Sequence, residues 1–298
     1  MGTPLVSVIL TSYNNDANLE STIKSVLEQD YPNIEIVAIE CESNDGVIEV
    51  LTKYSDKVTW KSQKCKNKAT ALSKCFNWAD GDIVVWLDAG DTLEQGAVSS
   101  AVKAFEGEKS LAIVYGDAMI QYYKDSSASS FKSEPFSLRR LASYNYIIPS
   151  SAFVSRKLYE DVGGINKELD HSFAYDLWVR LAKKYEVKYV EKVFSTHLSI
   201  TVRKVLTPYD KLKMSGERLR TVMKNYRYAP PGRVFVYTYN LVAGKLGKIP
   251  LLRVLLLPIV FVVSFFSYLM LNKGIRFSDL GEFGYRSLKN TFNDGAYN

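Results

Sequence analysis

Three apolar runs decide the fold of this 298-residue chain: VSVILT at residues 6–11, IEIVAIE at 34–40 and DIVVWLD at 82–88. Each run is short, rich in β-branched residues and followed by polar or turn-forming residues, which is typical of a strand buried on both faces. Between the first two runs, NLESTIKSVLE at residues 18–28 carries apolar side chains at helical spacing. A strand, a helix and a strand within about 35 residues form a βαβ unit, so the sequence predicts a parallel sheet.

The alternation of helices and strands continues outward from these runs. We expect further helices at residues 45–54, 68–79 and 96–105, and further strands at 57–61 and 111–115. This order predicts an α/β protein with a doubly wound, mostly parallel sheet of the Rossmann-like kind. Ligands bind such sheets outside the carboxyl ends of the strands. The polar strand ends at residues 11–14, 40–45 and 88–91 are therefore the candidate site segments.

The second half of the chain is predicted to contain a loop, a turn and several helices. Residues 122–137 are rich in Ser and Lys and predict a mobile loop near a site. A turn is expected at Val162-Gly163-Gly164. Two segments have the pattern of amphipathic helices, AYDLWVRLAKKY at 174–185 and the basic stretch 209–227.

Basic residues are concentrated around an apolar segment near the carboxyl end. Ten Lys or Arg residues and no Asp or Glu occur between Arg218 and Ser278, although the formal charge of the whole chain is only +6. A positive region within apolar sequence favours anionic lipid as a partner, since each basic group near such a surface adds about 1 kcal/mol of attraction. No known nucleic-acid-binding motif accompanies the charge, so nucleic acid is not an expected partner.

The apolar segment 249–271 leaves three arrangements open. Its 18 uncharged residues, 254–271, would form a helix about 27 Å long, slightly short of a ~30 Å hydrocarbon core. The segment could span the membrane once, lie in its plane or re-enter it, or pack as a soluble core or oligomer interface. Either membrane arrangement predicts a protein at the cytoplasmic side of the cell membrane, associated through its carboxyl-terminal region. Three cysteines without metal-type spacing agree with a reduced compartment.

Carboxylates near two element ends are the candidate catalytic groups. Asp88 and Asp91 follow a buried strand, where they can hold Mg²⁺ or Mn²⁺ together with phosphate oxygens. Asp176 is the candidate general base, because the first turn of a helix stabilises its charge and Arg180 can pair with it four residues later. The alternative for Asp91 and Asp176 is that they only cap helices.

Polar groups at the first two strand ends are candidates for binding a nucleotide. Tyr13 can stack on a base, and Glu40 on the neighbouring strand can accept a hydrogen bond from a base or ribose. The alternative is an ordinary turn with a surface tyrosine. We expect His171 to be an ordinary surface histidine, whereas His197 is left open.

Six segments then follow one another along roughly residues 4–200: VSVILTSYNN, SVLEQDYPNIEIVAIE, GDIVVWLDAGDTL, VYGDA, SSAFVSRKLYEDVGGIN and YDLWVRLAKKY. This series resembles the family 2 glycosyltransferases of the GT-A fold, and most of all the bacterial members that build surface polysaccharides and glycolipids. The resemblance implies a GT-A domain at residues 1–205, with a nucleotide-binding half at 1–115 and an acceptor-side half at 116–205. Residues 206–298 would be a basic, helical, membrane-associated extension.

The resemblance also implies a reaction and its residues. The chain would move a sugar from a nucleotide-diphosphate donor to a hydroxyl of a lipid-linked or saccharide acceptor, with inversion. Asp176 matches the catalytic base, Asp91 matches the ligand of a divalent cation (Mn²⁺ or Mg²⁺), and Glu40 falls where the family has a base-binding Asp. The other residues implied to bind the donor are Thr11, Tyr13, Asn14 and Asp88.

Departures from the family pattern leave a second interpretation open. Gly90 replaces the Asp that precedes the metal ligand, and Cys65 and Ser73 stand where the family has other donor-site residues. Lys64, Lys66 and Lys68 add positive charge that could hold the diphosphate directly, and we assign Lys66 to the donor site. The alternative function is a catalytically impaired, glycosyltransferase-like membrane scaffold that binds a partner transferase. A homo-oligomer is also left open.

Overall fold

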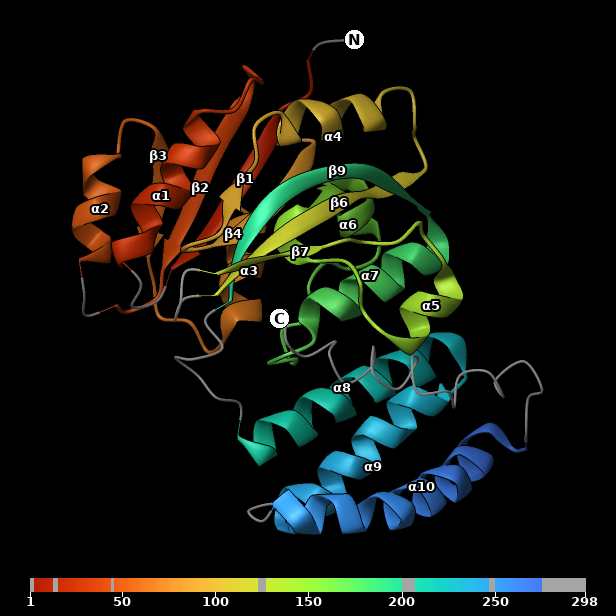
Figure 1. Ribbon diagram of the computed structural model, residues 1–298. Coiled ribbons are helices and arrows are strands. Elements are labelled where there is room, and N and C mark those ends of the chain that lie inside the picture. Colours follow the sequence, from red (N-terminus) through yellow and green to blue (C-terminus); the bar gives the residue numbers. More distant parts are fainter. Residues whose placement is uncertain are drawn as a thin grey trace. The chain divides into compact units, whose positions relative to one another are not determined.

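The computed structural model describes residues 3–12, 16–43, 46–122, 127–199, 207–246 and 250–274. The chain forms two compact units. Unit 1 consists of Met1–Phe136 and Ile147–Val202, and unit 2 consists of Ser137–Tyr146 and Arg203–Asn298. Unit 1 holds a sheet with helices, whereas the described part of unit 2 is helical (Figure 1). Nothing in the sequence pattern distinguishes Ser137–Tyr146 from its neighbours, yet this segment groups with the carboxyl-terminal helices.

The strands of unit 1 form one sheet in the order β3-β2-β1-β4-β8-β6-β9-β5, with β7 paired to β6 (Figure 1). The first four of these strands are parallel, while β8 runs antiparallel to both of its neighbours. The predicted α/β fold is therefore confirmed. The sheet is mixed and not mostly parallel, because β6 pairs parallel with β9 but antiparallel with β7 and β8, and β5 pairs antiparallel with β9. The strands are β1 (Val6–Ser12), β2 (Ile34–Glu40), β3 (Val58–Ser62), β4 (Ile83–Asp88), β5 (Thr92–Leu93), β6 (Leu111–Tyr122), β7 (Ala128–Phe131), β8 (Ala152–Ser155) and β9 (Glu186–Ser199).

The core of unit 1 explains why these runs became strands. Val8 in β1 pairs with Ile36 on one side and Val85 on the other, and all three side chains are buried. Helix α1 adds Leu19 and Ile23 to the same core cluster, which is the apolar stripe that its spacing predicts. The helices of unit 1 are α1 (Asp16–Leu27), α2 (Val47–Lys53), α3 (Lys68–Phe76), α4 (Ala97–Phe105), α6 (Arg156–Asp161) and α7 (Phe173–Lys184), with a 3₁₀ turn at Pro149–Ser151.

The region predicted to be a loop at residues 122–137 differs from the prediction. Strand β6 continues to Tyr122, and Ala128–Phe131 form β7, which pairs antiparallel with β6 from Ala118 to Gln121. The prediction of a loop is therefore wrong for Ala128–Phe131. Backbone pairing with an adjacent strand supplies the hydrogen bonds of β7, so its polar side chains do not prevent strand formation.

Unit 2 contains α5 (Leu138–Ser143), α8 (Pro208–Tyr226), α9 (Pro231–Leu246) and α10 (Pro250–Asn272). Helix α8 confirms the amphipathic helix predicted at 209–227. It begins with a capping box in which the Thr207 side chain and Asp210 exchange hydrogen bonds with each other's backbone N–H groups. Among the residues that the structure describes, no helix combines the length and apolar character needed to cross a membrane.

Candidate active site

Asp88 ends strand β4, and two side chains from other elements hold its carboxylate. Thr11 Oγ1, on the neighbouring strand β1, donates a hydrogen bond to Asp88 Oδ1 at 2.7 Å. The Lys68 ammonium, at the first residue of α3, forms an ion pair with Asp88 Oδ2. Burial acts to raise the pKa of Asp88, but Lys68 and Thr11 outweigh it and hold the pKa below its ordinary value. The Asp88 side chain still exposes 34% of its surface, so a ligand can reach this charged pair.

Asp91 lies three residues beyond Asp88 and is almost fully buried. Its Oδ1 lies 2.9 Å from His197 Nδ1 and accepts a hydrogen bond from the backbone N–H of Leu198 at 3.0 Å. Burial acts to lower the pKa of His197, but the carboxylates of Asp91 and Asp88 outweigh it and raise the pKa above its ordinary value. His197 and Leu198 belong to β9, so the end of that strand meets the end of β4 at this carboxylate.

The capping interpretation of Asp91 is wrong. Helix α4 begins at Ala97 with Gly96 in the N-cap position, and the short strand β5 separates it from Asp91. Asp91 therefore owes its burial to its contacts with β9 and not to a helix end.

Asp91 could hold a divalent cation, and His197 could join it only as a neutral imidazole. Their Oδ1 and Nδ1 atoms face each other at 2.9 Å as an ion pair when His197 is protonated, so a cation would have to replace that proton. Asp91 Oδ2 has only a long contact of 3.4 Å with the backbone N–H of Asp88, which leaves its lone pairs largely available. The residues that the structure describes contain no group of three or more His, Cys, Asp or Glu side chains that could hold an ion. Phosphate oxygens of a ligand and water could complete the coordination shell.

Gly90, which departs from the family pattern, is required by the backbone at this site. Its φ is +108°, in the region that L-residues with side chains rarely adopt. A Cβ at this position would lie 2.5 Å from Leu198 Cδ2. The close approach of β9, which brings His197 to Asp91, therefore leaves no room for the acidic side chain of the family pattern.

The start of α7 lies beside the Lys68–Asp88 pair. Lys68 Nζ is 5.9 Å from the centre of the Phe173 ring, at the first residue of α7. Asn67, which caps α3, donates a hydrogen bond to Asp170 Oδ1 at 2.7 Å and so fixes the segment that leads into α7. The amino ends of α3 and α7 and the carboxyl end of β4 therefore converge at one place.

Asp176 lies in the first turn of α7 and is held by an arginine fork. Its Oδ2 accepts a hydrogen bond from Arg180 Nε at 2.7 Å, which confirms the predicted pairing of these two residues. The other two nitrogens of Arg180 donate to the carbonyl oxygens of Val162 and Gly164, at 2.8 and 2.7 Å. The guanidinium therefore joins α7 to the turn predicted at Val162-Gly163-Gly164 and orients the Asp176 carboxylate.

Two stacked tryptophan side chains connect α7 to β4 close to the candidate site. Trp178 stacks on Trp86 with ring centres 5.2 Å apart. Trp86 lies two residues before Asp88, and Trp178 lies two residues after Asp176. These contacts bring the element of each carboxylate to the same region of the sheet, although a common cleft for Asp91 and Asp176 stays a prediction.

Glu40 is fully buried at the end of β2. Its Oε2 accepts a hydrogen bond from Ser62 Oγ at 2.5 Å, and its Oε1 accepts one from the backbone N–H of Ser43. The side chain thus closes the turn after β2, and its predicted contact with a base stays a prediction. Tyr13 and Asn14 lie outside the described residues.

The structure favours Lys68 over Lys66 as the cation at the site. Lys66 is 70% exposed and forms an ion pair with Glu168 at 3.6 Å, whereas Lys68 reaches Asp88. Sequence spacing alone ranks the neighbouring lysines equally. The signal that separates them is the helix start, because Asn67 caps α3 and Lys68 is its first residue.

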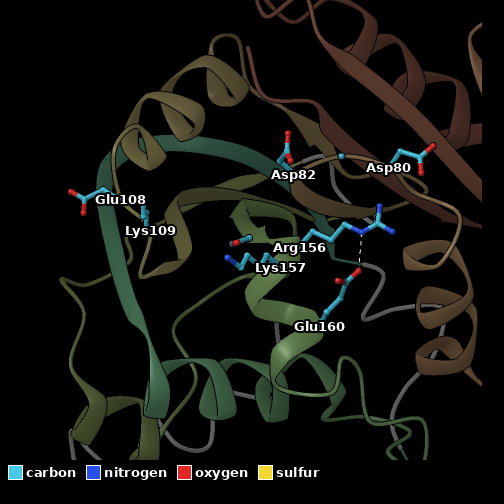
Figure 2. A pocket seen from close by; sticks show the side chains of 9 residues that line it. Asp80, Asp82, Glu108, Lys109, Arg156, Lys157 and Glu160 are labelled. Atoms are coloured by element: carbon cyan, nitrogen blue, oxygen red, sulfur yellow. Dashed lines mark hydrogen bonds and ion pairs between the residues drawn. The ribbon is translucent and has the colours of Figure 1, made fainter. Parts of the chain in front are cut away.

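A separate hollow lies at the opposite end of β4. It has a volume of about 400 Å³, and Figure 2 shows the charged side chains that line it. Arg156 pairs there with Glu160 at 3.0 Å. Asp82 in its wall precedes β4, so it is about 20 Å from Asp88 along the strand. The hollow is therefore not part of the candidate active site.

Comparisons with known sequences show the family of this chain. The sequence model described as "Glycosyl transferase family 2" matches residues 7–163. Chondroitin synthase of Escherichia coli is 22% identical over 236 residues, which are 76% of this chain and 34% of that protein. The Escherichia coli protein named UDP-Glc:alpha-D-GlcNAc-diphosphoundecaprenol beta-1,3-glucosyltransferase WfaP is 31% identical over 107 residues, which are 35% of this chain and 43% of that protein. The chain spans about a fifth to a third of the length of the first curated relatives.

A solved structure shares the fold. The mannosyltransferase PcManGT from Pyrobaculum calidifontis, in complex with GDP-Man and Mn²⁺, superposes with a TM-score of 0.59 at 17% sequence identity. The superposition covers 91% of this chain and 83% of that one. At this level of identity the likeness shows the architecture alone.

Proposed function

Because this chain belongs to glycosyl transferase family 2 and has the GT-A fold, we propose that it moves one sugar from a nucleotide diphosphate to a hydroxyl of a lipid-linked or saccharide acceptor. The chain is a glycosyltransferase; the donor, the acceptor and the inverting mechanism are the proposal. The observation that carries it is the cluster at the carboxyl end of β4, where Lys68, Asp88, Asp91 and His197 meet. This is the edge where doubly wound sheets bind nucleotides.

The donor diphosphate is held by positive charge from two sources. The Lys68 ammonium is partly exposed beside Asp88, where it can move onto a phosphate oxygen and exchange one anionic partner for another. Asp91 and His197 would hold Mn²⁺ or Mg²⁺, which stabilises the negative charge of the departing diphosphate when bound. Thr11 keeps the Asp88 carboxylate in place during this exchange.

Asp176 removes the proton from the acceptor hydroxyl. The acceptor oxygen forms a bond to the anomeric carbon while the bond from that carbon to the diphosphate oxygen breaks on the opposite face, which inverts the configuration. The proton stays on the Asp176 carboxylate, and Arg180 holds that carboxylate in one orientation. Burial excludes most water from this base, since its side chain is 8% exposed.

The acceptor is proposed to belong to cell-surface polysaccharide or glycolipid synthesis at the cytoplasmic side of the cell membrane. The name of WfaP describes a lipid-linked diphosphate acceptor, and the name of chondroitin synthase describes a polysaccharide product. The basic and apolar carboxyl-terminal region suits a protein whose acceptor is delivered at a membrane.

The test is release of nucleoside diphosphate from a panel of UDP- and GDP-sugars, with Mn²⁺ and membranes as the source of acceptor. Asp176→Asn should lower kcat by about 100-fold or more while donor binding is retained, because only the base is lost. Lys68→Met and Asp91→Asn should weaken donor binding itself, and the Asp91 variant should need more Mn²⁺. Asp56→Asn is the matched control, since this carboxylate is 72% exposed and remote in sequence from the site.

Full activity of both the Asp91 and the Asp176 variants would remove these assignments. If the unmodified protein binds a donor by calorimetry but releases no diphosphate with any acceptor fraction, the scaffold interpretation replaces the proposed transfer.

A further inference from the structure

Helix α10 exposes large apolar side chains over most of its described surface. Met270 is 82% exposed and Phe266 is 58% exposed. Contiguous exposed apolar surface of this kind marks a site of interaction with another molecule or a membrane. The other exposed apolar residues of α10 are Leu257, Ile259, Phe261, Val262, Val263 and Leu271.

Only a narrow stripe of α10 is buried. Val260, Ser264 and Tyr268 recur every four residues and are 0–2% exposed, as expected for one line of contact along a helix. Tyr268 packs in one cluster with Leu219 of α8 and Val234 of α9. Helix α10 is therefore a fixed part of unit 2, and the apolar side chains named above are exposed among the residues that the structure describes.

The carboxyl end of α10 is fastened to the loop between α8 and α9. Ala229 donates its backbone N–H to Asn272 Oδ1 at 2.9 Å, and Asn272 Nδ2 donates to the carbonyl oxygen of Ala229 at 3.0 Å. This pair of hydrogen bonds sets the position of Lys273, the residue after Asn272, relative to Arg227, the C-cap residue that follows α8. Both cations are exposed, and they lie at the end of the apolar face.

A basic ridge on α8 accompanies α10. Arg220, Lys224 and Arg227 are exposed and lie on one side of the helix, at spacings of four and three residues. Each of the first two immediately follows a residue that packs in the cluster around Tyr268, namely Leu219 and Met223. Helix α9 packs against both α8 and α10, and the ridge lies beside the cluster that the three helices share.

The net positive charge of unit 2 favours an anionic partner for the exposed face of α10. Its two segments contain eighteen Lys or Arg and five Asp or Glu residues, a net charge of +13, so the rest of the chain carries −7. A second copy that docked through its own unit 2 would bring the same positive charge and be repelled, whereas an anionic lipid surface is attracted. Large exposed apolar side chains close to a row of basic side chains are typical of helices that bind at the interface of an anionic membrane.

We propose that α10 lies in the plane of an anionic membrane, with Phe261, Phe266 and Met270 among the acyl chains and the α8 ridge and Lys273 at the headgroups. The α8 ridge extends from Arg220 to Arg227, about 10 Å along the helix axis, which an in-plane arrangement keeps at headgroup depth. Placing α10 across the bilayer would carry part of this ridge towards the hydrocarbon, where charged side chains are costly.

The test is flotation of the full chain with vesicles of phosphatidylcholine, either alone or with about one third phosphatidylglycerol. We expect binding to the anionic vesicles to be at least about tenfold stronger, and to weaken when salt is raised from about 0.1 to about 0.5 M. Phe266→Glu combined with Met270→Glu should lower binding to anionic vesicles by about 100-fold, because the apolar contact is lost. Lys224→Glu combined with Arg227→Glu should abolish the preference for anionic lipid.

Tyr209→Glu is the matched control. Tyr209 is 71% exposed but lies in the first turn of α8, ten residues and about 15 Å before Leu219, so this variant should bind like the unmodified chain. Circular dichroism of each variant establishes that the helices remain.

Three results would overturn the proposal. The first is equal binding of the unmodified chain and the Phe266/Met270 variant to anionic vesicles. The second is a lipid-free dimer, seen by light scattering, that the same variant converts to a monomer, which would assign the face to a second copy. The third concerns depth: Phe266→Trp fluorescence should be quenched best by lipids brominated near the headgroup, and stronger quenching from the bilayer centre would assign a spanning helix. None of these measurements needs a sugar donor, so they are independent of the proposed transferase activity.

Discussion

Gly90 shows how a single residue adapts this site. Its positive φ and its contact with Leu198 allow β9 to approach the end of β4, and that approach places His197 beside Asp91. In this chain, the absence of a side chain at position 90 therefore allows a histidine from another strand to reach Asp91. Lys68 compensates further, since it brings a positive charge that does not depend on a bound ion.

Gly90→Ala should destabilise the protein by about 2–4 kcal/mol, because it adds backbone strain to a clash with Leu198. Gly107→Ala is the matched control, since Gly107 also has a positive φ (+78°) but has no atom within 4 Å of an added Cβ. The Gly107→Ala control should lower the free energy of unfolding by only about 1 kcal/mol. Urea denaturation measures both values, and equal losses for the two variants would show that Leu198 moves aside freely.

At the residue scale, sequence reasoning identified the carboxylates but not all of their partners. Asp88, Asp91 and Asp176 follow or begin recognisable elements, so their positions at element ends could be predicted. His197 could not be assigned, because its strand, β9, mixes Lys and Glu with apolar residues and has no clear period. Contacts between strands that are distant in sequence decide which side chains meet, and a local pattern does not contain them.

At the scale of elements, Arg180 is the connection that positions α7. One guanidinium binds the Asp176 carboxylate and two backbone carbonyl oxygens, those of Val162 and Gly164. A planar fork can satisfy three acceptors at once, whereas an ammonium group at the same place cannot match that geometry.

Arg180→Lys should therefore lower the free energy of unfolding by about 1–3 kcal/mol, since buried carbonyl groups lose their donors. It should also reduce kcat about tenfold with little change in KM for the donor, because Asp176 is no longer held in one orientation. Arg156→Lys is the matched control: Arg156 also pairs with a carboxylate four residues away, Glu160, but that carboxylate is 60% exposed. We expect this control to stay within about 0.5 kcal/mol of the unmodified protein. A kcat that is equally unchanged in both variants would contradict a positioning role for Arg180.

The elements themselves divide into those with strong local signals and those without. The buried strands β1, β2 and β4 and the helices α1, α3, α4 and α7 were predictable, because apolar periodicity and burial coincide in them. Strand β7 was not predictable, since its polar residues gain their structure from backbone pairing with β6. Strand β8, the next strand in the sequence, pairs with β4 and β6 over only a few residues. Such a short strand has too few residues to show a strand pattern in the sequence.

At the scale of the whole molecule, the chain passes between the two units three times. It enters unit 2 at Ser137, returns to unit 1 at Ile147 and enters unit 2 again at Arg203. Within unit 2, Arg233 Nε of α9 donates to the carbonyl oxygen of Ala142 in α5 at 3.4 Å, and Leu141 of α5 is fully buried. Helix α5 therefore depends on the carboxyl-terminal helices.

A chain truncated after Val202 should melt at least about 4 °C lower than the full chain and should aggregate, because α5 loses the helices that bury Leu141. A chain ending at Gly274 is the control, since it retains α8, α9 and α10. Differential scanning fluorimetry and light scattering compare the three proteins. An unchanged melting temperature and a monodisperse truncated chain would contradict the dependence of α5 on unit 2.

The grouping of Ser137–Tyr146 with unit 2 also constrains how this chain can be recombined with a protein of the same architecture. A chimera made with one crossover near residue 202 would combine the α5 segment of one parent with the tail of another, and the two sides of their shared packing would no longer match. Two grafts are needed to exchange the tail intact, one of ten residues in mid-sequence and one of everything after Val202. Substitutions in the short graft and in the tail should accordingly compensate one another, although about sixty residues separate them in the sequence.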